Sequence, residues 1–354
     1  MRLSCEPLIR GGMVRERRMK SKILLAFCIS LLASAAMAAP TGYKITRLVS
    51  DVSGKAPNTD AQLVNAWGLA QFSDSDPVWV SNNNSNTSTF YNRTSGSKVG
   101  SVAVTSGNPT GIVAGPGTGF NVTENTKTGS SIFIFDTESG TIEGWAHSVD
   151  GAKTIVAYNG AANGSVYKGL AIDPTTNHLF AADFANGQVQ IFDNTFKLLG
   201  SFTDKKLPRR YAPFDVAVLN GNLYVAFAER DSTHMNQING AGLGYVDVFS
   251  TSGTLINQLI AQGPLNAPWG LTIAPSGFGA FAGDLLVANF GNGWINAFDP
   301  ATGAMLGTLS DAKGYPITIK GLWALDNGPG TGTITFSAGP AGQLQGLLGL
   351  ITPN

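Results

Sequence analysis

Hydrophobic and polar residues follow one repeating pattern from residue 65 to residue 351. Each copy opens with small, polar or aromatic residues and a Gly or Asp. An apolar run follows, then a second apolar run that ends in a polar residue, and a third that ends in an aromatic residue. The six openings read NAWGL from Asn65, NPTGI from Asn108, YKGL from Tyr167, APFDV from Ala212, APWGL from Ala267 and IKGLW from Ile319. A period of about 50 residues with several short strands per copy is typical of a β-propeller.

The third copy shows the repeating unit most clearly. We expect its strands at residues 169–173, 178–183, 188–193 and 196–202. Asn186 and Gly187 are a strong hairpin signal between the second and third strands. The alternation of polar and apolar residues from Gln188 onward indicates a half-buried strand. Four antiparallel strands per copy make a propeller blade.

The two ends of this pattern complete each other. The sixth copy ends with its third strand, at residues 346–351, and residues 43–49 read as a strand that belongs to no earlier copy. We therefore expect the N-terminal strand to complete the last blade, which leaves no blade edge unpaired. The sequence predicts an all-β fold, a six-bladed β-propeller of four-stranded antiparallel blades, as a single domain at residues 41–354. A β-helix is the alternative, but its repeats are shorter and more uniform.

Residues 1–38 have the pattern of an export signal. Basic residues precede an apolar stretch at residues 23–32, and small residues follow as far as Ala38. This order is typical of a secretory signal peptide, here cleaved after Ala38. The apolar stretch is shorter than the roughly 20 residues that span a bilayer. We interpret residues 1–18 as the product of an upstream start codon. The prediction is export to the periplasm or the extracellular space, without membrane insertion after cleavage.

Cleavage changes both the charge and the cysteine content. The whole chain has 23 Lys and Arg and 23 Asp and Glu, but residues 1–38 hold seven of the basic residues, two of the acidic ones and both cysteines, Cys5 and Cys28. The mature chain then has 16 basic and 21 acidic residues, and no disulfide. A mildly acidic surface without a basic cluster argues against nucleic acid and anionic membranes as partners. We expect a monomer that binds a small molecule, a glycan or a protein.

Candidate binding residues gather on one predicted face. Antiparallel strands alternate in direction, so the starts of the first strands and the ends of the second strands lie together near the central channel. Polar residues at the ends of second strands are Asn82, Glu124, Asp183, Glu229 and Asn289. Residues near the starts of first strands include Asn65, Lys168, Asp215, Trp269 and Lys320. Long insertions at residues 150–166 and 230–242 are predicted on the same face, where loops commonly bind ligands.

These candidates also have structural interpretations. An Asp or Asn that follows a strand often caps the turn by accepting hydrogen bonds from nearby backbone amides. Trp67, Trp269 and Trp323 fit wedges packed between blades. Lys168 and Lys320 stand in apolar openings, where a lysine needs solvent or a carboxylate partner. Asp183 and Glu124 are the carboxylates expected to provide it.

The sequence lacks the signatures of common hydrolases. It has no GxSxG elbow and no HExxH motif, and the mature chain has no cysteine,. The candidates for catalysis are His234 as a general base beside Glu229, and Lys168. Glu124, Asp183, Glu229 and Asn289 offer the carboxylate and amide oxygens that Ca²⁺ takes as ligands. Ca²⁺ is therefore the cofactor that these residues would hold.

Several segments resemble known propellers. The opening phrase, the second strands that end in Asp or Asn, and the third strands that end in Phe are similar to NHL-type repeats. The segments LVNAWGL from Leu63, GPLNAPWGL from Gly263 and GFGAFAGDLL from Gly277 resemble an uncharacterised family of secreted bacterial six-bladed propellers. The likeness extends along nearly the whole mature chain. It implies the fold and export, and it brings no established reaction.

The function predicted from these features is recognition of a ligand or partner through the channel face. The alternative is a metal-dependent hydrolase or lyase, similar to lactonase-like six-bladed propellers with a channel metal. A structural envelope protein is a further alternative.

Overall fold

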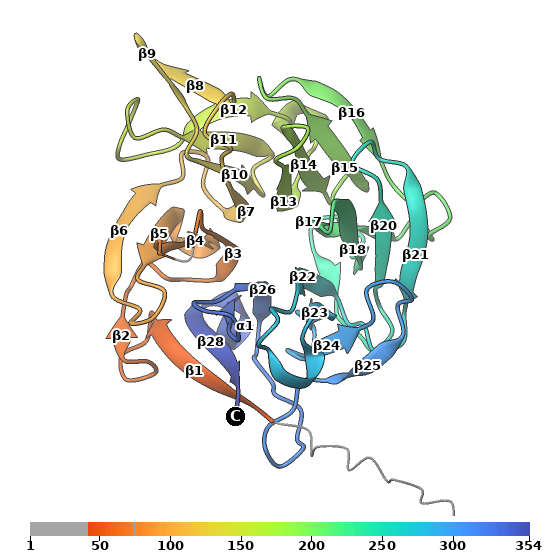
Figure 1. Cartoon of the computed structure of the whole chain (residues 1–354). Coiled ribbons are helices and arrows are strands. Elements are labelled where there is room, and N and C mark those ends of the chain that lie inside the picture. The colour runs from red at the N-terminus through yellow and green to blue at the C-terminus, as the bar shows by residue number, and fades with distance from the viewer. Residues whose placement is uncertain (1–41, 74) are drawn as a thin grey trace, which may run out of the picture. The chain divides into compact units, whose positions relative to one another are not determined.

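The strands of this protein are arranged as blades around a central axis (Figure 1). The computed structural model describes residues 42–73 and 75–354, so the predicted signal peptide and both cysteines lie outside the described residues. Each of six sheets contains four antiparallel strands in the order inner to outer, which makes the fold a six-bladed β-propeller, as predicted,. No helix in the described part of the chain is long and apolar enough to cross a bilayer.

The first three blades follow one another along the chain. Blade 1 contains β3 (Ala66–Ala70), β4 (Val78–Asn82), β5 (Thr87–Tyr91) and β6 (Lys98–Ala103). Blade 2 contains β7 (Pro109–Ala114), β10 (Phe133–Thr137), β11 (Thr141–Trp145) and β12 (Ile155–Asn159), with the hairpin of β8 (Asn121–Glu124) and β9 (Lys127–Ser130) inserted after its inner strand. Blade 3 contains β13 (Tyr167–Asp173), β14 (His178–Asp183), β15 (Gln188–Phe192) and β16 (Leu198–Phe202).

The last three blades have the same order. Blade 4 contains β17 (Tyr211–Leu219), β18 (Asn222–Arg230), β20 (Tyr245–Phe249) and β21 (Leu255–Ala261), and β19 (Gln237–Ile238) pairs with β18. Blade 5 contains β22 (Pro268–Ile273), β23 (Leu285–Asn289), β24 (Ile295–Phe298) and β25 (Met305–Thr308). Blade 6 contains β26 (Leu322–Asn327), β27 (Ile334–Ala338), β28 (Leu347–Pro353) and β1 (Tyr43–Ser50), with β2 (Asn58–Thr59) beside β1. Short helical turns are η1 (Asn83–Ser85), η2 (Ala161–Asn163), η3 (Gly279–Phe281) and α1 (Pro340–Gln343).

The predicted ring closure is confirmed. Strand β1 pairs antiparallel with β28 along its length, from Tyr43 opposite Pro353 to Ser50 opposite Leu347. In Figure 1 the orange β1 lies beside the blue β28. Because the outer strand of the last blade comes from the other end of the chain, backbone hydrogen bonds join the first and last strands of the ring.

Blade 2 differs from the prediction. Glu124 is predicted to end the second strand, but it lies in the inserted β8–β9 hairpin, and the true second strand is β10. Residues 150–166 are predicted as an insertion, yet they contain β12, the outer strand of the blade. Residues 230–242 do form a connection that follows a second strand, as predicted.

Apolar side chains fill the spaces between neighbouring blades. Six clusters of buried hydrophobic residues each join two adjacent blades, and a seventh lies on the axis. The apolar residues of each inner and second strand therefore contact the blades on both sides. This packing explains why the second strands are recognisable as apolar runs.

Inner strands of adjacent blades approach to backbone contact at one layer. Pairing with the second strand is irregular at this layer in every blade. The positions there are Gly68, Gly111, Gly169, Asp215, Gly270 and Ala324. A Cβ added to Gly68 would lie 2.6 Å from the Thr110 carbonyl oxygen, and one added to Gly270 would lie 2.5 Å from the Trp323 carbonyl oxygen. Real Cβ atoms do not approach backbone so closely, so glycine is needed for contact between these strands.

The glycine layer gives a direct test. A Cβ at Gly169 would lie 2.8 Å from the Asp215 Cα, so Gly169→Ala must push β13 and β17 apart. We expect a loss of roughly 1–3 kcal/mol in the free energy of unfolding, measured by denaturant titration. The matched control is Gly200→Ala, where nothing lies within 4 Å of the new Cβ, and its expected change is within about 0.5 kcal/mol. Equal effects of the two substitutions would contradict backbone contact at this layer.

Candidate ligand-binding site

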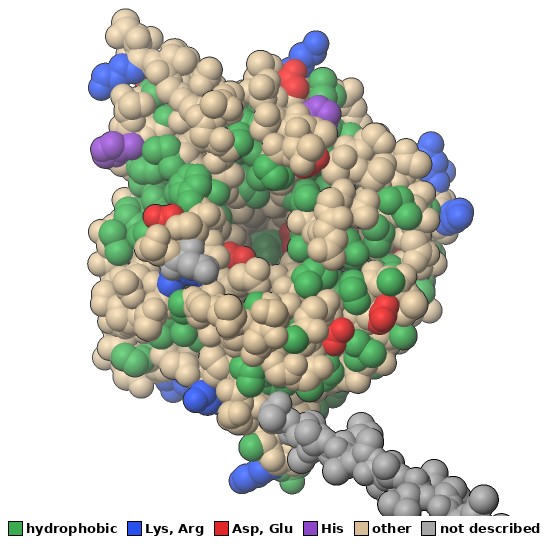
Figure 2. Space-filling view, viewed as in Figure 1, with side chains coloured by type: hydrophobic (Ala, Val, Ile, Leu, Met, Phe, Trp, Pro, Cys, Tyr) green, Lys and Arg blue, Asp and Glu red, His purple; other side chains and the backbone are tan. Residues whose placement is uncertain are grey.

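A cavity of about 650 Å³ lies at the centre of the ring. All six inner strands line it with the residues that follow their openings, such as Leu69, Ile112 and Leu271. Figure 2 shows a hollow at the middle of the ring with hydrophobic side chains on its wall. The cavity opens at the ends of the inner strands. The sequence predicts binding at the face where these strands start, which is the face opposite the mouth of this cavity.

An aromatic cluster closes the channel toward the starts of the inner strands. The rings of Trp67 and Trp323 stack with centroids 3.6 Å apart, and Trp269 meets both edge-on. Phe290 stacks on Trp323 at 4.1 Å, and Phe214 meets it edge-on. We call this group the aromatic plug. The three tryptophans, predicted as wedges between blades, come from blades 1, 5 and 6 and pack against one another, and Trp269 also lines the cavity.

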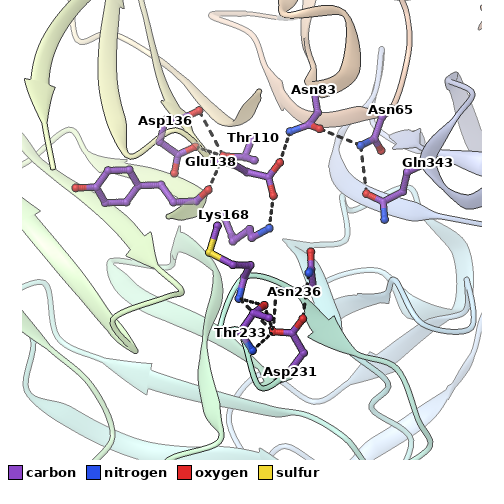
Figure 3. A network of polar contacts seen from close by, with 12 residues as sticks. Asn65, Asn83, Thr110, Asp136, Glu138, Lys168, Asp231, Thr233, Asn236 and Gln343 are labelled. Atoms are coloured by element: carbon purple, nitrogen blue, oxygen red, sulfur yellow. Dashed lines mark hydrogen bonds and ion pairs between the residues drawn. The ribbon is translucent and has the colours of Figure 1, made fainter. Parts of the chain in front are cut away.

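A chain of polar side chains lies next to the plug (Figure 3). Lys168 is only 1% exposed, and its ammonium group forms an ion pair with Glu138. The Asn83 side chain donates to the other Glu138 oxygen at 2.9 Å, and Asn65 donates to Asn83 and to Gln343. The Lys168 Nζ also lies 5.3 Å from the centre of the Trp67 ring,. The network therefore supplies a buried lysine with a carboxylate and an aromatic face.

Two buried carboxyl groups lie in or next to the floor. Asp215 lines the cavity and is 7% exposed. Asp136 is fully buried behind Gly111; its Oδ1 accepts hydrogen bonds from the Gly111 N–H and the Thr110 hydroxyl, and its Oδ2 has no partner. Burial raises the pKa of Asp136 to about 7, although these two donors oppose the shift. Burial, and less strongly the carboxyl of Asp136, raises the pKa of Asp215 well above its usual value,.

Four of the predicted site residues form hydrogen bonds or ion pairs within their own blade or with the loop that leads into it. Asn82 donates to Thr89, and Asn289 bonds the backbone of Asn266 and Pro264. Asp183 accepts from the Val166 N–H and from nearby side chains, which is the turn-capping role weighed for it from sequence. Glu229 forms a partly exposed ion pair with Arg210 at 3.3 Å.

Of the predicted residues, the structure brings only a few together. Asn65 and Lys168 belong to the polar chain, and the Trp269 indole N–H donates to the Lys168 carbonyl at 2.9 Å. Asp215 lies in the cavity. Lys320 is exposed and lines a separate pocket of about 470 Å³, and His234 is exposed in a turn of the connection after β18.

Asp136 and Glu138, both in blade 2, are residues of the site that were not predicted from the sequence. Glu124 does not end a second strand; it lies in the inserted hairpin and pairs with Lys153. Thr137 ends the true second strand, next to Asp136 and Glu138. Glu138, and neither Asp183 nor Glu124, is thus the carboxylate partner of Lys168. One signal was available, because NVTE has no apolar run like those of the other second strands, whereas FIFD from Phe133 does.

The residues predicted to hold Ca²⁺ lie apart from one another on separate blades. Among residues 42–73 and 75–354, no group of three or more His, Cys, Asp and Glu is placed to hold a metal ion. Glu124, Asp183 and Glu229 each have the local partners described above. Binding of Ca²⁺ stays a prediction from the sequence.

The fold and the closed channel define a class of protein, a six-bladed propeller with an axial cavity open at one face. One solved structure similar to it is virginiamycin B lyase from Staphylococcus aureus, with a TM-score of 0.53 and 15% identity, covering 88% of this chain and 99% of that one. Likeness at this identity shows the fold alone. No protein-family model matches the sequence.

By sequence, the chain belongs to the same family as the uncharacterized protein R648 of Acanthamoeba polyphaga mimivirus. The two are 33% identical over 328 residues, which is 88% of this chain and 81% of that protein. The uncharacterized protein L690 of the same virus is 29% identical over 322 residues, or 87% of this chain and 85% of that protein. A third relative, the uncharacterized protein R640, is 31% identical over 210 residues.

The raised pKa of Asp136 predicts that the stability of the protein depends on pH. Its raised pKa means that the folded protein binds this proton more tightly than the unfolded chain does, so folding loses stability as pH rises from about 4 to about 7,. Asp136→Asn keeps an acceptor for Thr110 and Gly111 without a titratable group. We expect the variant to gain roughly 2–4 kcal/mol relative to the wild type between pH 4.5 and pH 8, measured by urea unfolding at both values.

Other buried acids contribute to the pH dependence of both proteins, and the contribution of Asp215 is smaller in the variant because Asp136 no longer raises its pKa. The pKa values of Asp215 and Asp247 are also raised, mainly by burial. The quantity to compare is therefore the difference between the two proteins at each pH. A difference that stays constant from pH 4.5 to pH 8 would show that Asp136 does not titrate in this range.

Proposed function

We propose that this protein is a small-molecule-binding propeller whose ligand enters the central cavity from the face where the inner strands end. The observation that carries the proposal is the cavity itself. A volume of about 650 Å³ is within the usual range for small-molecule sites,. The aromatic plug closes one end, so a ligand has a single way in.

The walls support a ligand that is partly apolar. Leu69, Ile112, Leu170 and Leu271 are among the lining residues. Each inner strand pairs on one side only, so its free edge offers backbone N–H and C=O groups to the cavity. An apolar wall with a few polar groups and one buried carboxyl is a common design of binding sites.

Export is part of the same proposal. The support is the order of basic, apolar and small residues at positions 1–38 and the resemblance to secreted bacterial propellers,. The ligand would then be met outside the cytoplasm. The lyase chemistry of a structural neighbour with 15% identity is not carried to this chain.

Ligand binding in the cavity can be tested by blocking it. Ala114 is half-buried and lines the cavity at the end of β7, and Ala114→Phe places a ring there. We expect fragments found by ligand-observed NMR with the wild type to bind roughly tenfold or more weakly to this variant. The control Ala301→Phe, in the exposed turn after β24, should bind them unchanged. An absence of fragments sensitive to Ala114→Phe would rule the cavity out as the site.

Export has its own test. Expression of the full chain in a bacterial host should give an exported protein whose N-terminus is Ala39, seen by mass spectrometry of the intact periplasmic or secreted product,. Replacement of the small residue before the cleavage point, Ala38→Arg, should leave the leader attached. Cytoplasmic protein with an intact leader in the unmodified chain would contradict the proposal.

A further inference from the structure

Asp215 is the exception in the glycine layer. The other inner strands have Gly or Ala at this position, and blade 4 alone has a residue with a polar side chain. Its carboxyl group fits because the neighbour, Gly169, has no Cβ: an added Cβ would overlap the Asp215 Oδ1. Asp215 is only 7% exposed, and it lines the cavity. No side-chain partner bonds it in the described part of the chain.

The lining has no positive charge to balance this carboxyl. Among the described residues that line the cavity, none is Lys, Arg or His; besides Asp215, the charged residue among them is Asp326 near the mouth. Lys168 lies beyond the aromatic plug, where Glu138 neutralises it. Arg93 lies behind the rim and donates to the carbonyl oxygens of Ser73 and Asn327. The cavity thus combines apolar side chains and polar groups on its wall with an anionic group at its floor.

We propose that the cavity binds an organic cation, a protonated amine on an apolar body, with the ammonium group against the Asp215 carboxylate. This inference rests on the proposed function and adds the charge class of its ligand. The Val216 backbone N–H bonds the Asp215 carboxyl group, and an ammonium group would add a partner of opposite charge. The apolar body would cover the walls formed by Leu69, Ile112 and Leu271. An anionic ligand would meet the carboxyl without any cation in the lining to offset it.

The protonation of Asp215 supports the same assignment. Burial and Asp136 raise its pKa in the empty cavity, which favours the neutral acid,. When an ammonium group binds, the neutral acid gives its proton to solvent and becomes the carboxylate of an ion pair. Amine binding should therefore release protons, and the heat of binding should depend on the ionisation enthalpy of the buffer.

Three probes of similar shape distinguish a cationic, a neutral and an anionic ligand: 3-phenylpropylamine, 3-phenylpropan-1-ol and 3-phenylpropanoate. We expect isothermal titration with the mature protein to show the amine binding roughly tenfold or more tightly than the alcohol, and the carboxylate most weakly. Asp215→Asn should abolish the advantage of the amine and its proton release. The matched control is Asp284→Asn, which removes one acidic group from the connection between β22 and β23, outside the cavity lining.

Each outcome decides something different. Equal affinity of the amine and the alcohol, or preference for the carboxylate, overturns the cation assignment and leaves ligand binding in the cavity standing. If no probe binds, the fragments sensitive to Ala114→Phe are sorted by charge, and a set not enriched in amines overturns the assignment in the same way. If no such fragments exist, the proposed function fails and this inference fails with it. If Asp215→Asn does not fold, the charge ranking and the buffer-dependent heat of the wild type remain decisive.

Discussion

Contact between the backbones of neighbouring inner strands is the constraint on which this structure depends. At one layer of the channel, Gly68, Gly111, Gly169 and Gly270 lack the Cβ atoms that would clash with the neighbouring strand. The bulky residues that precede this layer in blades 1, 5 and 6 are Trp67, Trp269 and Trp323, and they pack against one another. On the other side of the layer, the inner strands line the cavity.

The same constraint makes the two ends of the channel chemically different. On one side lie the aromatic plug and the polar chain that includes Lys168 and Glu138. On the other side lies the cavity, which has a mixed polar and apolar wall and opens to solvent. Asp215 sits at the boundary because blade 4 departs from glycine there. A ring of six similar blades thereby acquires one distinctive side chain on its axis, which is how a repeated scaffold can have an asymmetric site.

Sequence reasoning found the repeats, the blade count and the closing strand because each depends on local patterns of apolar residues and turns. It misplaced Glu124 because the hairpin of β8 and β9 separates the opening of blade 2 from its second strand. The cavity at the other end of the channel could not be predicted, because the direction of the strands says which residues share a face and says nothing about which end aromatic side chains block. The place of Asp215 in the cavity lining and the burial of Lys168 depend on neighbours from other blades. Such contacts are set by packing between repeats, which no single copy shows.

The pairing of β1 with β28 also has a consequence for how the protein is made. Residue 43 meets residue 353, so the last blade cannot be completed until nearly the whole chain has been synthesised. Contacts between residues so distant in sequence form slowly, because a long loop must close first. Until then, five blades can pack one on another while the cavity lacks part of its wall and two strand edges stay unpaired. A complete cavity is thus a late product of folding, and a nascent chain has none.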